Sequence, residues 1–130
     1  MWSVAEKLAF KKSLESRTSD FAIAVFRSLD ALPPFVSSKV ISYQLGKSAS
    51  SVGANYREAN RAESRDDFNH KNKIGIVLKE CSESLYWVEL LRRLYPDQDV
   101  YSQLVKECSE LVCLFQSVKR RLHEKRKEIS

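Results

Sequence analysis

Glycine and proline are scarce in this chain, with three of each among 130 residues. A β-sandwich or barrel needs a turn roughly every 8–12 residues, and such turns depend mainly on these two residue types. The scarcity excludes those folds and predicts long helices. Hydrophobic residues at 43% and charged residues at 30% are ordinary for a globular protein and exclude a disordered chain. The length is typical of a single domain, covering residues 1–130.

Cysteine is also rare, and its three copies are an odd number without close pairing. This pattern argues against a disulfide framework and for a reducing compartment. No uncharged apolar run approaches the roughly 18 residues that a membrane span requires. The start of the chain lacks the pattern of a signal peptide. We therefore predict a cytoplasmic protein that does not enter a membrane.

Histidine occurs only twice, at His70 and His123, which leaves little material for acid–base or metal chemistry. A di-metal site in a helical bundle needs two Glu-x-x-His motifs and further carboxylates. Here Asp67 and His70 form a single, related half-motif. The segment 46–48 (Gly-Lys-Ser) resembles the end of a phosphate-binding loop but lacks its upstream glycine. We predict no enzyme, no metal and no cofactor.

Prolines and a capping signal divide the chain into four helical segments. Pro33 and Pro34 interrupt any helix, and Pro96 does so again. Ser64, followed by acidic residues, is a candidate N-cap. The predicted helices lie near 3–31, 36–62, 65–94 and 97–127. Short connections between helices of similar length predict an all-α, antiparallel, up-down-up-down four-helix bundle.

Apolar residues recur at spacings of three and four within these segments, which is typical of a buried helix seam. In the fourth segment they are Tyr101, Leu104, Cys108, Leu111, Phe115, Val118 and Leu122. In the third they are Ile74, Leu78, Cys81, Leu85 and Val88. Two of the cysteines thus fall on seams and are interpreted as small core residues.

The end of the third segment carries more apolar residues than one seam can bury. They cover nearly the whole helix circumference and include Tyr86, Trp87, Leu90, Leu91 and Leu94. An uncovered patch of this kind is an association site, so we expect these five residues to form a subunit interface. The alternative is that Tyr86 and Trp87 only cover the end of the bundle.

The second segment has a polar face beside its apolar stripe, with Ser51, Asn55 and Glu58 at helical spacing. Small residues fill the same stretch, and Gly53 is unfavourable inside a helix. Close approach of a neighbouring helix explains them, with Asn55 and Glu58 hydrogen-bonded across it. Lys71 and Lys79 are both candidate partners of Glu58. A ligand-binding role for this face is the second interpretation.

The positive charge of the chain is concentrated at residues 119–130. This stretch holds a net charge of +4, out of +5 for the chain, through Lys119, Arg120, Arg121, Lys125, Arg126 and Lys127. Cations at a helix C-terminus complement the helix dipole, so a solvated helix end is one interpretation. Contact with a nucleic-acid backbone is the other. No aromatic residue interleaves the run, so base stacking is not expected.

Two spaced motifs carry a family resemblance. The first is Gln44-Leu45, Ser51-Val52-Gly53-Ala54-Asn55 and Glu58-Ala59; the second is Ser64, Asp67-Phe68, Lys71, Lys79-Glu80, Glu83, Tyr86-Trp87 and Leu90-Leu91. Together they resemble the four-helix-bundle family encoded in intervening sequences of bacterial 23S ribosomal RNA genes. More distantly, the chain is similar to the accessory protein of diversity-generating retroelements.

The resemblance implies a bundle that assembles with itself into a homopentameric ring and has no established enzymatic activity. The genomic setting of the family suggests association with RNA or the ribosome. The retroelement accessory protein binds nucleic acid and a reverse transcriptase, which implies RNA, DNA or a nucleic-acid-processing protein as partners. Five copies of the basic end would bring about +20 together, enough to attract a polyphosphate backbone.

Two functional hypotheses follow from these features. The first is a non-catalytic, oligomeric module that associates with RNA or another nucleic acid through basic surfaces. The second is a protein-interaction scaffold without a nucleic-acid role. A third, weaker hypothesis is a small-molecule binder or enzyme that uses Asn55 and Glu58, which requires an open pocket beside the second helix.

Overall fold

The chain folds into four helices. The computed structural model describes the backbone of residues 1–62 and 67–129 and the side chains of residues 1–62 and 68–124. The helices are α1 (Val4–Asp30), α2 (Val36–Ala62), α3 (Asp67–Leu94) and α4 (Asp99–Ile129), with no strand in the described residues. Their bounds lie within two residues of the predicted ones. The predicted N-cap, Ser64, lies outside the described residues.

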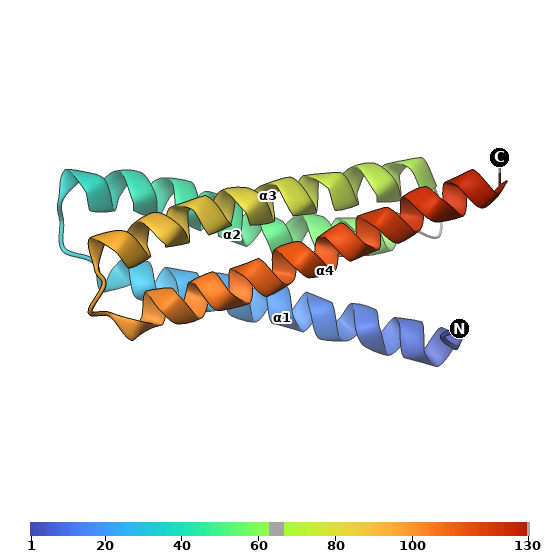
Figure 1. The fold of residues 1–130 in the computed structure, drawn as a ribbon, viewed down its shortest axis with the longest axis horizontal. Helices are drawn as coiled ribbons and strands as arrows, with labels where there is room; N and C mark the ends of the chain where they lie inside the picture. Colours follow the sequence, from blue (N-terminus) through green and yellow to red (C-terminus); the bar gives the residue numbers. More distant parts are fainter. Residues whose placement is uncertain (63–66, 130) are drawn as a thin grey trace.

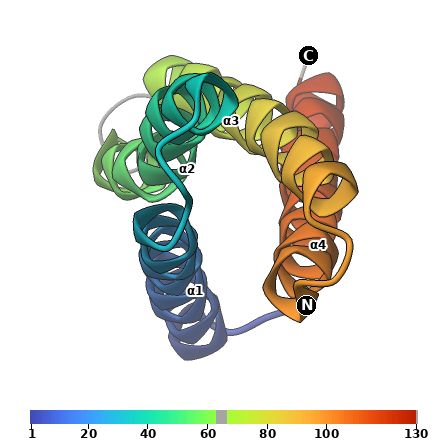
Figure 2. The same ribbon diagram turned by 90° about the vertical axis from the view of Figure 1, so that its left-hand side faces the viewer.

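Consecutive helices run in opposite directions, which confirms the up-down-up-down bundle (Figure 1). Both ends of the chain lie at one end of the bundle, which we call the open end. The connections 31–35 and 95–98 lie at the opposite end, which we call the loop end. Viewed from the loop end, α1 and α4 occupy opposite sides, and they pack against each other less than any other neighbouring pair (Figure 2). No helix in the described ranges has an apolar stretch that would cross a membrane.

Local chemistry sets where the helices begin and end. Ser3 caps α1: its hydroxyl accepts from the Glu6 backbone nitrogen at 3.1 Å, and Glu6 Oε1 accepts from the Ser3 nitrogen at 3.1 Å. This reciprocal capping box satisfies two donors that the first helical turn leaves unpaired. Leu32 donates to the Leu29 carbonyl at 3.1 Å as α1 ends, and Pro33 then prevents its continuation.

The buried seam of α4 follows the prediction. Tyr101, Leu104, Cys108, Leu111 and Phe115 are all buried. Val118 and Leu122, which complete the predicted seam toward the open end, are only half-buried. The core therefore thins out before α4 ends.

The seam of α3 differs from the prediction. The residues buried along it are His70, Ile74, Val77, Cys81, Ser84, Val88 and Leu91, whereas Leu78 and Leu85 are only half-buried. Helix α3 packs against both α2 and α4, so its buried surface is wider than one seam. Leu78 lies on the flank beside α4, where it lines a groove with Gln116. Apolar spacing alone does not distinguish the centre of such a surface from its flank.

Small residues on α2 allow the neighbouring helices to approach closely, as predicted. A Cβ on Gly53 would lie 3.1 Å from Thr18 Oγ1 and 3.7 Å from the Thr18 backbone carbonyl carbon, both on α1. On the side facing α3, the hydroxyls of Ser48 and Ser84 are 2.8 Å apart and fully buried. These contacts account for the low side-chain bulk of this stretch.

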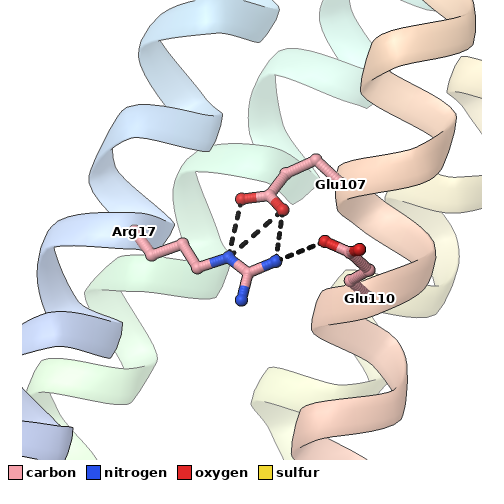
Figure 3. Close-up of polar contacts among 3 residues, drawn as sticks. All are labelled: Arg17, Glu107 and Glu110. Atoms are coloured by element: carbon pink, nitrogen blue, oxygen red, sulfur yellow. Dashed lines mark hydrogen bonds and ion pairs between the residues drawn. The ribbon is translucent and has the colours of Figure 1, made fainter.

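An ion-pair cluster joins the middle of α1 to α4 (Figure 3). Arg17 Nε donates to Glu107 Oε2 at 2.9 Å, and Arg17 Nη2 donates to Glu110 Oε2 at 2.6 Å. Hydrogen bonding to Glu107 raises the pKa of Arg17 above its usual value. On the N-terminal side of this cluster, no residue from 4 to 13 is fully buried. The first three turns of α1 therefore diverge from the rest of the bundle (Figure 1).

The glycines allow a test of this packing. Gly75→Ala is expected to raise the free energy of unfolding by about 1 kcal/mol, because alanine has the higher helix propensity and nothing lies within 4 Å of the new methyl group. Gly53→Ala gains the same propensity but is expected to destabilise the protein. Thr18 is fully buried, and its hydroxyl is held by the Glu15 carbonyl at 2.9 Å, so it has no room to retreat. Urea denaturation of both variants measures the difference; shifts of the same sign would contradict the packing at Gly53.

Candidate nucleic-acid interface

The basic residues near the end of α4 fall on two sides of that helix. Lys119, Arg120 and Arg121 are exposed, whereas the side chains of Lys125, Arg126 and Lys127 lie outside the described ones. Lys119 and Arg120 line a groove shared with α3. The Arg121 guanidinium instead lies 6.0 Å from the ring centre of Trp2, near the start of α1. Successive helical residues point about 100° apart, which accounts for the separation.

The groove between α3 and α4 gathers cations from both helices. It encloses about 290 Å³ and is lined by Lys71, Leu78, Gln116, Lys119, Arg120 and His123. Sequence reasoning did not include Lys71 or His123 in a nucleic-acid site. His123 lies one helical turn after Lys119 and Arg120, and this spacing is the signal that would have found it. Lys71 comes from another helix, so only the fold brings it here.

The cations of the groove come together without a carboxylate beside them in the described lining. Within the described part of the chain, Lys71, Lys119 and Arg120 make no ion pair. Some cations elsewhere do pair with carboxylates: Lys73 Nζ lies 2.7 Å from Glu58 Oε2, and Arg57 Nη1 lies 3.3 Å from Glu15 Oε1. The groove therefore offers positive charge that its described surroundings do not compensate.

The polar face of α2 is occupied by interactions within the protein. Ser51 donates to the Lys47 carbonyl at 2.8 Å, and Asn55 donates to the Ser51 carbonyl at 2.9 Å. Asn55 thus bonds within its own helix rather than across to a neighbour, contrary to our expectation. Glu58 does reach across to α3, but its partner is Lys73, not Lys71 or Lys79. Hydrogen bonding to Lys73 lowers the pKa of Glu58 below its usual value. This arrangement favours a packing role for the face.

The apolar residues at the end of α3 divide into buried and exposed members. Leu91 is fully buried within the chain, so it has no surface left for a second subunit, and its assignment to the interface was wrong. Tyr86 and Leu94 are more than half exposed, and Trp87 and Leu90 are half-buried. The Tyr86 and Trp87 rings meet edge to face with centres 5.0 Å apart. Four residues are thus left for a contact between subunits, and we call them the loop-end patch: Tyr86, Trp87, Leu90 and Leu94.

A second exposed apolar group was missed by sequence reasoning. Phe35, Val36, Val40 and Tyr43 lie just before and along the first turns of α2, each more than half exposed. Because α2 begins at the end of the bundle where α3 finishes, this group shares the loop end with the loop-end patch (Figure 1). Its residues follow a helical spacing of three and four on the side of α2 opposite its buried seam. This second apolar stripe, opposite the buried one, was the feature of the sequence from which the group could have been predicted.

Three buried titratable residues, His70, Cys81 and Cys108, make contacts within the protein. His70 is buried, and its Nδ1 lies 2.7 Å from the Ala59 carbonyl oxygen. No group of three potential ligands for a metal ion occurs among the described residues. Cys81 and Cys108 are buried as predicted, and Cys108 donates to the Cys81 carbonyl at 3.3 Å. Hydrogen bonding with the Cys81 side chain, together with burial, raises the pKa of the Cys108 thiol.

Comparisons with known proteins agree with the motifs described above. Residues 13–117 match the family of 23S rRNA-intervening sequence proteins. A solved structure from Bacteroides thetaiotaomicron, a protein with unknown function from the S23 ribosomal protein family, is 33% identical with a TM-score of 0.67. The match covers 81% of this chain and 96% of that chain. No curated protein matches this chain. The resemblance carried by the two motifs is thereby confirmed.

Proposed function

Because this chain belongs to the family of 23S rRNA-intervening sequence proteins, we propose that it is a non-catalytic helical-bundle module that associates with RNA. The family name connects the chain to the genes of ribosomal RNA, and the basic groove between α3 and α4 supplies a means of contact. Binding occurs through the phosphate backbone, and the assembly of several copies strengthens it.

The observation that carries the proposal is the uncompensated charge of the groove. Lys71, Lys119 and Arg120 bring three cations together without a carboxylate in the described lining. A phosphate that enters the groove displaces condensed counterions, and their release drives association. His123 adds a hydrogen-bonding group beside the cations. Such phosphate contacts position a nucleic acid without recognising its sequence.

Self-association is the second part of the proposal. Tyr86 and Leu94 leave 58% and 52% of their surface exposed beside the half-buried Trp87 and Leu90, and apolar residues grouped in this way are typical of an association site. We propose that the loop-end patch forms the contact between subunits of a homopentameric ring in the cytoplasm. The open end, with its groove, remains accessible in each subunit. An RNA backbone that touches several grooves at once gains affinity through effective concentration.

One observation favours a protein-interaction scaffold as a second candidate function. Phe35, Val36, Val40 and Tyr43 form an exposed apolar group beyond the residues assigned to the ring contact. Such a group fits a protein partner, including a nucleic-acid-processing protein. The ratio of absorbance at 260 and 280 nm in the purified protein separates the two functions, because only the first predicts co-purified RNA.

The charge of the groove can be tested by a triple substitution. Lys71→Gln, Lys119→Gln and Arg120→Gln together are expected to weaken binding of single-stranded RNA. They should also reduce the slope of log K against log salt by roughly 2, at about 0.7 for each phosphate that is no longer neutralised. Filter binding over a series of salt concentrations measures both quantities.

The matched control removes the same charge from the loop end. Arg27, Lys39 and Arg93 are exposed and lie near the end of α1, the start of α2 and the end of α3. Their joint substitution by glutamine should leave the salt slope almost unchanged. Equal loss of affinity in both triple variants would show a general charge effect, and the groove would then have no specific role.

Aspartate substitutions at Leu94 and Leu91, with Leu8 as the control, test the loop-end patch. Leu94→Asp is expected to convert the assembly into a folded monomer, because the new charge is buried only when subunits meet. Leu91→Asp places the charge inside the chain itself and should unfold it, at a cost of several kcal/mol. Light scattering reports the mass, and circular dichroism reports the fold.

Leu8 provides the control for this experiment. It has the same exposed fraction as Leu94, 52%, but lies on α1 near the open end. Leu8→Asp should therefore retain both the fold and the mass of the assembly. The proposed contact is refuted when the unmodified protein is monomeric or when Leu94→Asp keeps the full mass.

A further inference from the structure

A cavity at the open end lies on the side of α4 opposite the groove. It encloses about 230 Å³, and all four helices line it. Its apolar lining includes Trp2, Phe10, Tyr56 and Ile74. The cavity exists because the first turns of α1 diverge from the core, which leaves Trp2 exposed and Phe10 only half-buried.

We propose that this cavity binds one unpaired nucleobase of a single-stranded RNA, and that a neighbouring phosphate contacts Lys7 and Arg121 at its edge. The inference rests on the proposed RNA association and specifies how the strand is held beyond its backbone. The base enters between side chains from α1 and α4, while other phosphates of the strand occupy the groove on the far side of α4.

The size and charge of the cavity favour this occupant. Sites for drug-sized ligands enclose roughly 300–1,000 Å³, so 230 Å³ suits a single small ring system. Lys7 and Arg121 line the cavity, and no carboxylate among the described residues does. A ligand that joins a flat apolar ring to an anion satisfies both features, and a nucleotide within a strand is such a ligand.

Aromatic side chains supply the stacking surface. The Trp2 and Phe10 ring centres are 5.1 Å apart with planes inclined at 59°, and Trp2 is 44% exposed. The Arg121 guanidinium lies 6.0 Å from the Trp2 ring centre. Bases in single-stranded RNA stack on aromatic rings and on arginine guanidinium planes. The basic run itself holds no aromatic residue, but the fold brings Trp2 from the start of the chain beside Arg121 and so supplies the aromatic surface that the run lacks.

Two polar groups in the lining distinguish between bases. His70 Nδ1 is held by the Ala59 carbonyl, which only accepts, so in the neutral ring Nδ1 carries the proton and Nε2 is the acceptor. Asn60 Nδ2 donates to Glu15 Oε2 at 2.9 Å, which leaves its Oδ1 as an acceptor. Both remaining atoms pair with an exocyclic amino group. Cytosine, adenine and guanine each have such a group with two hydrogens, whereas uracil offers only its single N3–H donor, so the cavity should bind uracil most weakly.

Nuclear magnetic resonance of the two tryptophan indoles tests the inference on the intact chain. Trp2 lines the cavity, whereas Trp87 lies toward the loop end of α3 and serves as an internal control. A cytidine octamer should shift the Trp2 indole signal and leave that of Trp87 in place. A duplex of equal length, the same octamer with abasic nucleotides and a uridine octamer should shift it much less.

Substitutions extend the test to affinity. Trp2→Ala should weaken binding of the cytidine octamer about tenfold, within the range expected when one aromatic stacking partner is removed. Tyr43→Ala, which removes an exposed aromatic residue near the loop end, should not change it. Trp2 precedes α1, so its removal should leave the helix content intact, as circular dichroism would verify.

The outcomes separate this inference from the proposed function. An unmoved Trp2 indole signal, or an unchanged affinity in Trp2→Ala, overturns the proposed base-binding cavity. The proposed phosphate contact in the groove is judged separately, and loss of affinity in its triple variant supports it. For a protein that binds no octamer, the probe is cytidine 5′-monophosphate. A shift of the Trp2 indole signal larger than that caused by ribose 5-phosphate then supports the cavity, though not the groove. A shift that is no larger overturns the cavity.

Discussion

The contact of α1 with α2 at Gly53 is the constraint on which the arrangement of this bundle depends. Thr18 lies against the glycine so closely that a methyl group there would crowd its hydroxyl and its backbone. One residue earlier, Arg17 reaches Glu107 and Glu110 on α4. Helix α1 is thus fixed at its middle to both neighbours, by steric fit on one side and by charge on the other. Its direction beyond that point determines what happens at the open end.

The divergence of α1 gives the end of α4 two different environments. On the α3 side, Lys71, Lys119 and Arg120 meet without a carboxylate in the described lining, and the Glu58 carboxylate of α2 pairs with Lys73 outside the groove. On the α1 side, Arg121 lies over an aromatic residue beside a cavity. Two consecutive residues of α4 therefore line different surfaces: Arg120 lines the charged groove, and Arg121 lines the cavity. A bundle closed along its full length would bury Trp2 and Phe10 and lose the second of these surfaces.

Features encoded locally were predictable from the sequence, and features that depend on contacts between helices were less so. Proline positions and apolar spacing predicted the helices to within two residues. The seam of α4 was correct up to Phe115, whereas Leu78 and Leu85 of the predicted α3 seam are only half-buried because two neighbouring helices share the surface of α3. The pairing of Glu58 with Lys73 depends on the rotation of α3 against α2, which spacing does not determine. The proximity of Trp2 to Arg121 joins opposite ends of the chain and requires the fold itself.

The even number of antiparallel helices has a practical consequence for work with this protein. Both chain termini emerge beside the groove and the cavity, so an affinity tag or fusion partner at either terminus would obstruct ligand access there (Figure 1). The connections 31–35 and 95–98 lie at the distant end, and exposed connections tolerate insertions best. A label placed in one of them would leave the basic end unobstructed, at the risk of disturbing neighbouring subunits instead.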